Sequence, residues 1–199
     1  MALTKVQAEG LNLADTFAFT GTVTGTDMAL LHTTTVTSNV GQVQIDGLFT
    51  SAFKVYKIIG SNIHSVSNAV SLNLKYMAGG SLSTGSVHRS IQLKAVSNTT
   101  TLNGVAEASD TEFANTLGQK LGDQDGEHTN FELTLFDPLA TDNFKSFLCQ
   151  TMTKDSDGNV RLLHTAGTFN SGQSALSGIE AVCNSGDIAS GVFKLYGLR

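Results

Sequence analysis

The chain has 199 residues and a formal net charge of −5, with 40% hydrophobic and 15% charged residues. This length suits one β-sandwich domain, and the high apolar and low charged content exclude a disordered chain. The sequence has no cluster of Lys and Arg, which neutralisation of phosphates requires, so its composition argues against nucleic acid as a partner.

The sequence also argues against insertion into a membrane. It has no apolar run of membrane-spanning length, and the first ten residues lack the apolar core of a secretory signal. We therefore expect a protein that is made and assembled in a cytoplasm.

Residues 1–29 are predicted to form an N-terminal docking arm that precedes a β-sandwich domain at residues 30–199. Within the arm, larger apolar residues alternate with small or polar ones over residues 15–25, which predicts a strand or extended segment that ends in glycine. Phe17, Phe19 and Val23 are apolar, and a small arm cannot bury such residues alone, so we expect them to contact a neighbouring subunit. An edge strand of the domain itself is the alternative interpretation.

Ten short strands separated by polar turns are predicted after the arm, which indicates an all-β antiparallel sandwich. One proline and 20 glycines agree with this, since each proline removes a ladder donor and glycines supply turns. One insertion at residues 97–128 interrupts the strands, and its middle predicts a short helix at residues 106–117. The predicted strands are residues 30–38, 42–50, 53–60, 70–77, 86–95, 129–136, 145–153, 160–169, 175–184 and 191–198.

Four segments resemble virion proteins of tailed bacteriophages. Residues 185–197 follow the pattern S-G-x-I-x-S-G-x-F-x-L-Y-G, which resembles the closing strand of a β-sandwich module in those proteins. Residues 42–59 (QVQIDGLFTSAFKVYKII) and 72–80 (LNLKYMAGG) resemble a hairpin with an aspartate-glycine step and the strand and glycine turn that come next. Residues 10–25 resemble the N-terminal segments that join such modules to a neighbour.

The resemblance implies a jelly-roll type sandwich in a structural, non-enzymatic virion protein that is assembled in the cytoplasm of a host bacterium. It favours a tail fibre or a receptor-binding or adaptor component, with a capsid decoration or head-fibre protein as the alternative. A carbohydrate-active enzyme on the same sandwich is a third and weaker alternative. The partners that it implies are other virion proteins, further copies of the chain in a homotrimer, and a host surface glycan or protein.

Two acidic segments carry carboxylates at alternate positions, as calcium-binding loops do. Asp123, Asp125 and Glu127, followed by His128, are interpreted as a solvated turn without metal, on an insertion that would face a receptor; a calcium loop is the alternative. Residues 155–159 (DSDGN) lack the downstream glutamate of a calcium loop and predict a hairpin turn with Asp-Gly at its tip.

No other pattern indicates catalysis or a cofactor. The five histidines do not stand at metal-ligand spacing, and no nucleophile or phosphate-binding motif occurs in the sequence. Cys149 and Cys183 are expected to be free buried thiols, with a disulfide as the alternative. The sequence thus predicts a binding protein without catalytic residues, metal or cofactor.

Overall fold

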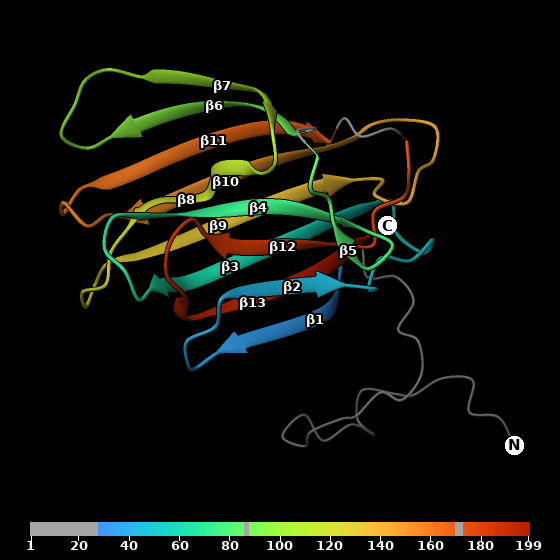
Figure 1. Ribbon diagram of the computed structural model, residues 1–199, viewed down its shortest axis with the longest axis horizontal. Coiled ribbons are helices and arrows are strands. Elements are labelled where there is room, and N and C mark those ends of the chain that lie inside the picture. Colours follow the sequence, from blue (N-terminus) through green and yellow to red (C-terminus); the bar gives the residue numbers. More distant parts are fainter. Residues whose placement is uncertain (1–27, 86–87, 170–172) are drawn as a thin grey trace, which may run out of the picture.

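The computed structural model describes residues 28–85, 88–169 and 173–199, which form two antiparallel β-sheets arranged like a sandwich (Figure 1). The eight-stranded sheet has the order β1 (Met28–Val36), β13 (Ile188–Leu198), β3 (Val55–Ser65), β9 (His128–Phe136), β10 (Lys145–Lys154), β11 (Val160–Phe169), β6 (His88–Val96) and β7 (Asn103–Asp110). The five-stranded sheet has the order β2 (Gln42–Asp46), β12 (Gly178–Cys183), β4 (Val70–Ala78) and β5 (Ser81–Leu82), and β8 (Phe113–Leu121) also pairs with β4. The predicted all-β antiparallel class is confirmed, and no helix that could cross a membrane occurs in the described part of the chain.

The hydrophobic core lies between the two sheets and follows from alternation along the strands. On β3, Tyr56 and Ile58 are fully buried, while Val55, Lys57 and Ile59, which alternate with them, are partly exposed. Aromatic rings join the sheets: Phe113 on β8 lies 4.8 Å from Phe147 on β10, and Tyr76 on β4 lies 5.3 Å from Phe169 on β11 (ring centroids). Each buried side chain of this size contributes about 1.5 to 3 kcal/mol to stability.

All ten predicted strands correspond to observed strands, with ends that differ by a few residues. The two predicted C-terminal strands, residues 175–184 and 191–198, correspond to β12 and β13, but these lie in different sheets and do not pair, so the predicted C-terminal hairpin is wrong. The prediction missed β5, β7 and β8.

The helix predicted at residues 106–117 is wrong, because this segment lies in β7 and β8. Phe113, Leu117 and Leu121 are fully buried at a spacing of four residues, which looks helical in the sequence. In the structure Asn115 and Lys120 have positive φ angles of 58° and 55°, and they interrupt the regular alternation of the strand. The pairing of β8 with β4 is correspondingly irregular.

The predicted boundary between arm and sandwich is at residue 30, and β1 begins at Met28. Phe17, Phe19 and Val23 lie outside the described residues. Their predicted contact with a neighbouring subunit therefore stays a prediction.

Gly178 is required where β12 passes between β2 and β4. A Cβ atom at this position would lie 2.3 Å from the carbonyl oxygen of Ile45 and 2.7 Å from the Cα of Asp46. Both are backbone atoms of the neighbouring strand, so they cannot rotate away. We expect Gly178→Ala to lower the free energy of unfolding by about 1 to 3 kcal/mol, as measured by urea denaturation.

Gly104→Ala is the matched control for this substitution. Gly104 also lies in a strand, but it is exposed and the nearest atom to its Cβ position is 3.9 Å away, on Leu93. We expect this variant to unfold at nearly the wild-type urea concentration. Equal stability of the two variants would contradict the close approach at Gly178.

Candidate functional site

The outer face of the eight-stranded sheet exposes large apolar side chains. On β10 the inward positions are buried and the outward positions, Leu148 among them, are exposed. Ile91, Leu93 and Leu148 are 57%, 47% and 55% exposed, respectively. Phe136, Met152 and Leu162 are also exposed on the strands of this face.

Strand register brings these residues together from distant parts of the sequence. Leu148 on β10 pairs with Ala166 on β11, and Ala166 pairs with Ile91 on β6. In the next outward row, Gln150 pairs with His164, which pairs with Leu93. Since paired residues share one face of a sheet, three adjacent strands place Ile91, Leu93 and Leu148 on one surface.

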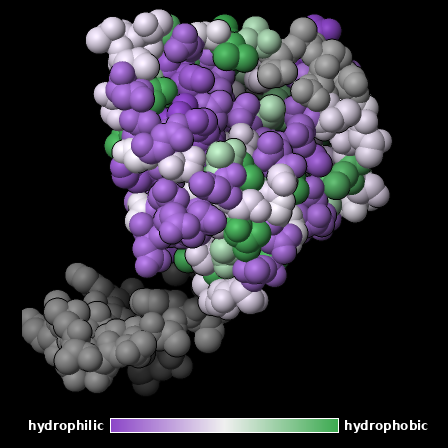
Figure 2. All heavy atoms as spheres, turned by 60° about the vertical axis from the view of Figure 1, so that its left-hand side comes forward, coloured by the Kyte–Doolittle hydropathy of each residue, from purple (hydrophilic) through white to green (hydrophobic). Residues whose placement is uncertain are grey.

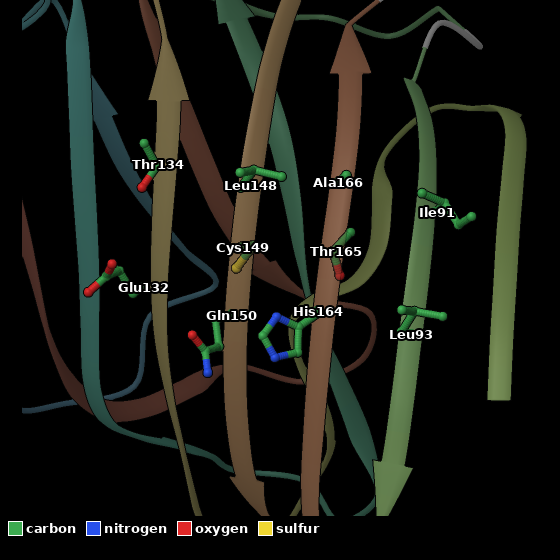
Figure 3. Close-up of a pocket in the computed structure, with 10 residues that line it drawn as sticks. All are labelled: Ile91, Leu93, Glu132, Thr134, Leu148, Cys149, Gln150, His164, Thr165 and Ala166. Carbon is green, nitrogen blue, oxygen red and sulfur yellow. The ribbon is translucent and has the colours of Figure 1, made fainter. Parts of the chain in front are cut away.

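A hollow of about 450 Å³ lies among these side chains (Figure 3). Its lining residues come from four adjacent strands, β9, β10, β11 and β6 (Figure 3). The apolar lining includes Ile91, Leu93 and Leu148, and the polar lining includes Glu132, Gln150 and His164.

Two further hollows extend the first one along the strands. One, of about 520 Å³, shares Ile91, Leu148 and Ala166 with it and reaches Phe136 and Ser146. The other, of about 260 Å³, shares Glu132 and Gln150 with it and reaches Met152 and Leu162. We call this continuous surface the outer trough. Along β10 it extends from Ser146 to Met152, and across the strands it extends from Phe136 on β9 to Ile91 on β6.

An ion pair lies on the rim of the outer trough. The carboxylate of Glu132 on its rim is paired with the Lys57 ammonium at 2.6 Å. Cys149 lies on β10 beneath the trough with its side chain on the core face, where Sγ donates to the carbonyl oxygen of Thr116 at 3.5 Å, and burial raises the pKa of the thiol to about 12 in spite of a hydrogen bond with Thr151. The thiol therefore stays protonated at neutral pH and is no nucleophile. The arrangement suits contact with an apolar partner.

Sequence reasoning missed the outer trough, although a signal for it exists. Phe147, Leu148 and Cys149 are consecutive apolar residues on one strand, as are Leu162 and Leu163 on the next. Adjacent residues of a strand point to opposite faces, so such runs require apolar residues on both faces of the sheet. Cys149 and Cys183 are both buried and free, as predicted.

The acidic loop that was predicted to face a receptor lies between β8 and β9. Asp123 and Asp125 are exposed, and the structure keeps Glu127 and His128 close to the loop backbone. Glu127 Oε2 accepts a hydrogen bond from the backbone N–H of Gln124 at 3.0 Å, and His128 Nδ1 lies 3.1 Å from the carbonyl oxygen of Gly126. Among the described residues, no group of three or more His, Cys, Asp or Glu side chains is placed to hold a metal.

Calcium should therefore leave the stability of the protein unchanged. We expect the same melting temperature in millimolar calcium as in chelator, because binding to the folded state alone would raise it. Differential scanning calorimetry measures this directly. A rise of several degrees that disappears in the Asp123→Asn, Asp125→Asn double variant would establish a calcium site instead.

The loop lies at the end of the sandwich that also carries the β10–β11 turn, on the left of Figure 1. The surface turned forward in Figure 2 is mostly hydrophilic. This end of the molecule thus differs in character from the apolar outer trough.

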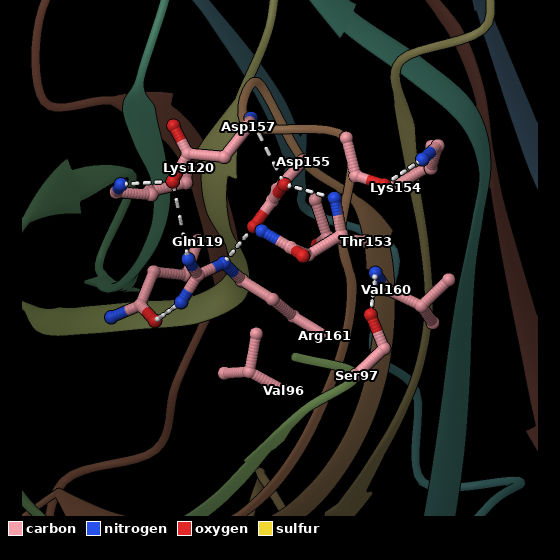
Figure 4. A network of polar contacts seen from close by, with 12 residues as sticks. Val96, Ser97, Gln119, Lys120, Thr153, Lys154, Asp155, Asp157, Val160 and Arg161 are labelled. Atoms are coloured by element: carbon pink, nitrogen blue, oxygen red, sulfur yellow. Dashed lines mark hydrogen bonds and ion pairs between the residues drawn. The ribbon is translucent and has the colours of Figure 1, made fainter. Parts of the chain in front are cut away.

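Residues 155–159 form the predicted hairpin turn between β10 and β11, with Gly158 at a φ of +80°. Asp155 is fully buried, and its Oδ1 accepts hydrogen bonds from the backbone N–H groups of Asp157 and Asn159 at 3.0 and 2.7 Å. Its other oxygen forms an ion pair with the largely buried Arg161 (Figure 4). This buried pair gives the acidic turn a structural role.

Around this pair, Arg161 Nη1 donates to Gln119 Oε1 at 3.3 Å, and Lys120 pairs with Asp157 (Figure 4). The hydrogen bond from Lys120 lowers the pKa of the exposed Asp157 carboxyl below its usual value. Gln119 and Lys120 belong to β8, so the network ties β8 to the β10–β11 hairpin.

Comparison of the chain with protein-family models, with curated proteins and with solved structures found no match in any of the three.

Proposed function

We propose that the protein is a structural component of a tailed-phage virion and acts by binding, without catalysis, on a jelly-roll type sandwich. The observation that carries this proposal is the outer trough, where Ile91, Leu93 and Leu148 are each about half exposed. Contiguous exposed apolar surface in a folded protein marks contact with another protein, a ligand or a membrane. The resemblance of residues 42–59 and 185–197 to phage virion modules is the reason for proposing a virion as the assembly to which the protein belongs.

Within the virion, we propose a tail fibre or a receptor-binding or adaptor component. The outer trough would contact neighbouring virion subunits, including further copies of the chain in a trimer. The hydrophilic end with the loop of Asp123, Asp125, Glu127 and His128 would face a host surface glycan or protein. Loops at the end of a rigid sheet stack suit this role because they tolerate change.

A capsid decoration or head-fibre protein is the second candidate. The chain has almost no repeated sequence between the arm and the sandwich, where a fibre would carry its shaft. An apolar contact face also suits attachment to a shell.

Immunogold electron microscopy tests the proposal on virions purified from a culture that produces the protein. Label on the tail supports the tail component, and label on the head supports the decoration protein. Unlabelled virions, with the protein detected only in the virion-free lysate, would contradict a virion role altogether. Deletion of residues 2–25 should leave the sandwich folded by circular dichroism and remove the protein from virions.

A further inference from the structure

We propose that the outer trough of one copy binds residues 17–23 of a neighbouring copy as an extended strand. This deepens the proposed function, since it assigns an acceptor surface to the arm, and it rests on the proposed contact between the arm and a neighbouring subunit. The length, side-chain pattern and charge of residues 17–23 support it, and so does the distance between Met28 and the trough.

The length of the segment matches the length of the trough. From Ser146 to Met152 on β10 the trough covers six residue steps, which is about 20 Å at the rise of a β-strand. An extended segment from Phe17 to Val23 also covers six steps and about 20 Å. The chain thus contains an apolar segment of the length that the trough accepts.

The side-chain pattern of the segment fits a surface on one side only. In an extended conformation Phe17, Phe19 and Val23 share one side. The opposite side consists of Ala18, Thr20 and Thr22, which suit contact with solvent. Two phenyl rings and a valine would cover the exposed Ile91, Leu93 and Leu148 without burying a polar side chain of the segment itself.

Charge favours this occupant and one orientation of it. Residues 16–26 contain no charged side chain, and the one carboxylate on the rim of the trough, Glu132, is already paired with Lys57. Arg89 is exposed at the Ser146 end of the trough. With Phe17 at this end, Asp15 comes within reach of the Arg89 guanidinium, and Val23 lies at the Met152 end.

The chain between Val23 and Met28 is too short for residues 17–23 to bind the trough of their own copy in this orientation, so the segment must come from another copy. Met28 begins β1, four strand spacings from β10, which is about 19 Å across the sheet. The register places Met28 level with the Ser146 end, so the Met152 end lies about 20 Å further along the strands. The five residue steps from Val23 to Met28 span at most about 18 Å, less than either distance.

Sedimentation of the full-length protein tests the contact. We expect wild type to associate, and Leu148→Asp or Phe19→Ser to raise the dissociation constant at least tenfold. Combining the two substitutions should add little, because both remove the same contact. Leu148 is exposed, so its variant should keep the wild-type circular dichroism spectrum. Leu102→Asp, at a residue that is 63% exposed outside the trough, should associate like wild type.

Photocross-linking identifies the contact and its direction. A benzophenone amino acid at position 17 of a tagged copy, mixed with untagged protein, should cross-link to the untagged copy near Ser146. A monomeric wild type, a cross-link within one copy, a cross-link outside the trough, or unchanged association of Leu148→Asp would each overturn the inference. If purified virions do not contain the protein, the proposed function is refuted, but the sedimentation and cross-linking results still decide the contact between copies. The failure of one proposal can therefore be distinguished from the failure of the other.

Discussion

Deletion of residues 192–199 should leave the protein unable to fold. β13 lies between β1 and β3 in the eight-stranded sheet, so the deletion removes the hydrogen-bonded partner of both strands. It also removes Phe193 and Leu195, which are 1% and 0% exposed. Each such side chain contributes about 1.5 to 3 kcal/mol, and a whole domain is stable by only about 5 to 15 kcal/mol. We expect aggregated protein or a thermal melt without a cooperative transition.

Deletion of Arg199 alone is the control for this truncation. Arg199 follows the end of β13 and is exposed, and its contact is with the ring of Phe53 at 5.9 Å from the guanidinium carbon to the ring centroid. Because no ladder hydrogen bond or buried side chain is lost, this variant should melt close to the wild-type temperature. Soluble and cooperatively melting protein from the longer deletion would show that β13 is dispensable.

Replacement of the buried Asp155 by alanine should be strongly destabilising. The substitution leaves the largely buried Arg161 guanidinium without its carboxylate and removes the acceptor of two backbone N–H groups in the turn. Removing one partner of a buried ion pair costs about 3 to 5 kcal/mol. Urea denaturation of Asp155→Ala against wild type measures the difference in the free energy of unfolding.

Two further variants separate the buried charge from the turn itself. The Asp155→Ala, Arg161→Leu double variant should recover part of the lost stability, since it no longer buries a cation that has lost its buried carboxylate partner. Asp157→Ala, at an exposed carboxylate of the same turn, should shift the urea midpoint far less, because solvent screens its pair with Lys120 and its longer contact with Arg161 at 3.8 Å. Wild-type stability of Asp155→Ala would contradict the burial of this pair.

The sequence by itself determined the strands whose side chains alternate regularly. Residues 145–153 and 160–169 were predicted as strands, and β10 and β11 lie there, joined by the predicted turn at residues 155–159. Alternation is a local property of the chain, because successive side chains of a strand point to opposite faces. The same reasoning failed on β8, where Phe113, Leu117 and Leu121 show a helical spacing that left-handed residues produce within a strand.

Only the tertiary structure decided which strands are neighbours, and the candidate site depends on that. Ile91, Leu148 and Ala166 form one row of the outer trough because β6, β11 and β10 are adjacent in the sheet. Likewise, Asp155 pairs with Arg161 in a buried position that their turn-like sequence context does not indicate. The alternation of side chains predicts which residues share one face of a strand. The order of the strands in the sheet depends on how the whole chain packs, and no local sequence pattern predicts it.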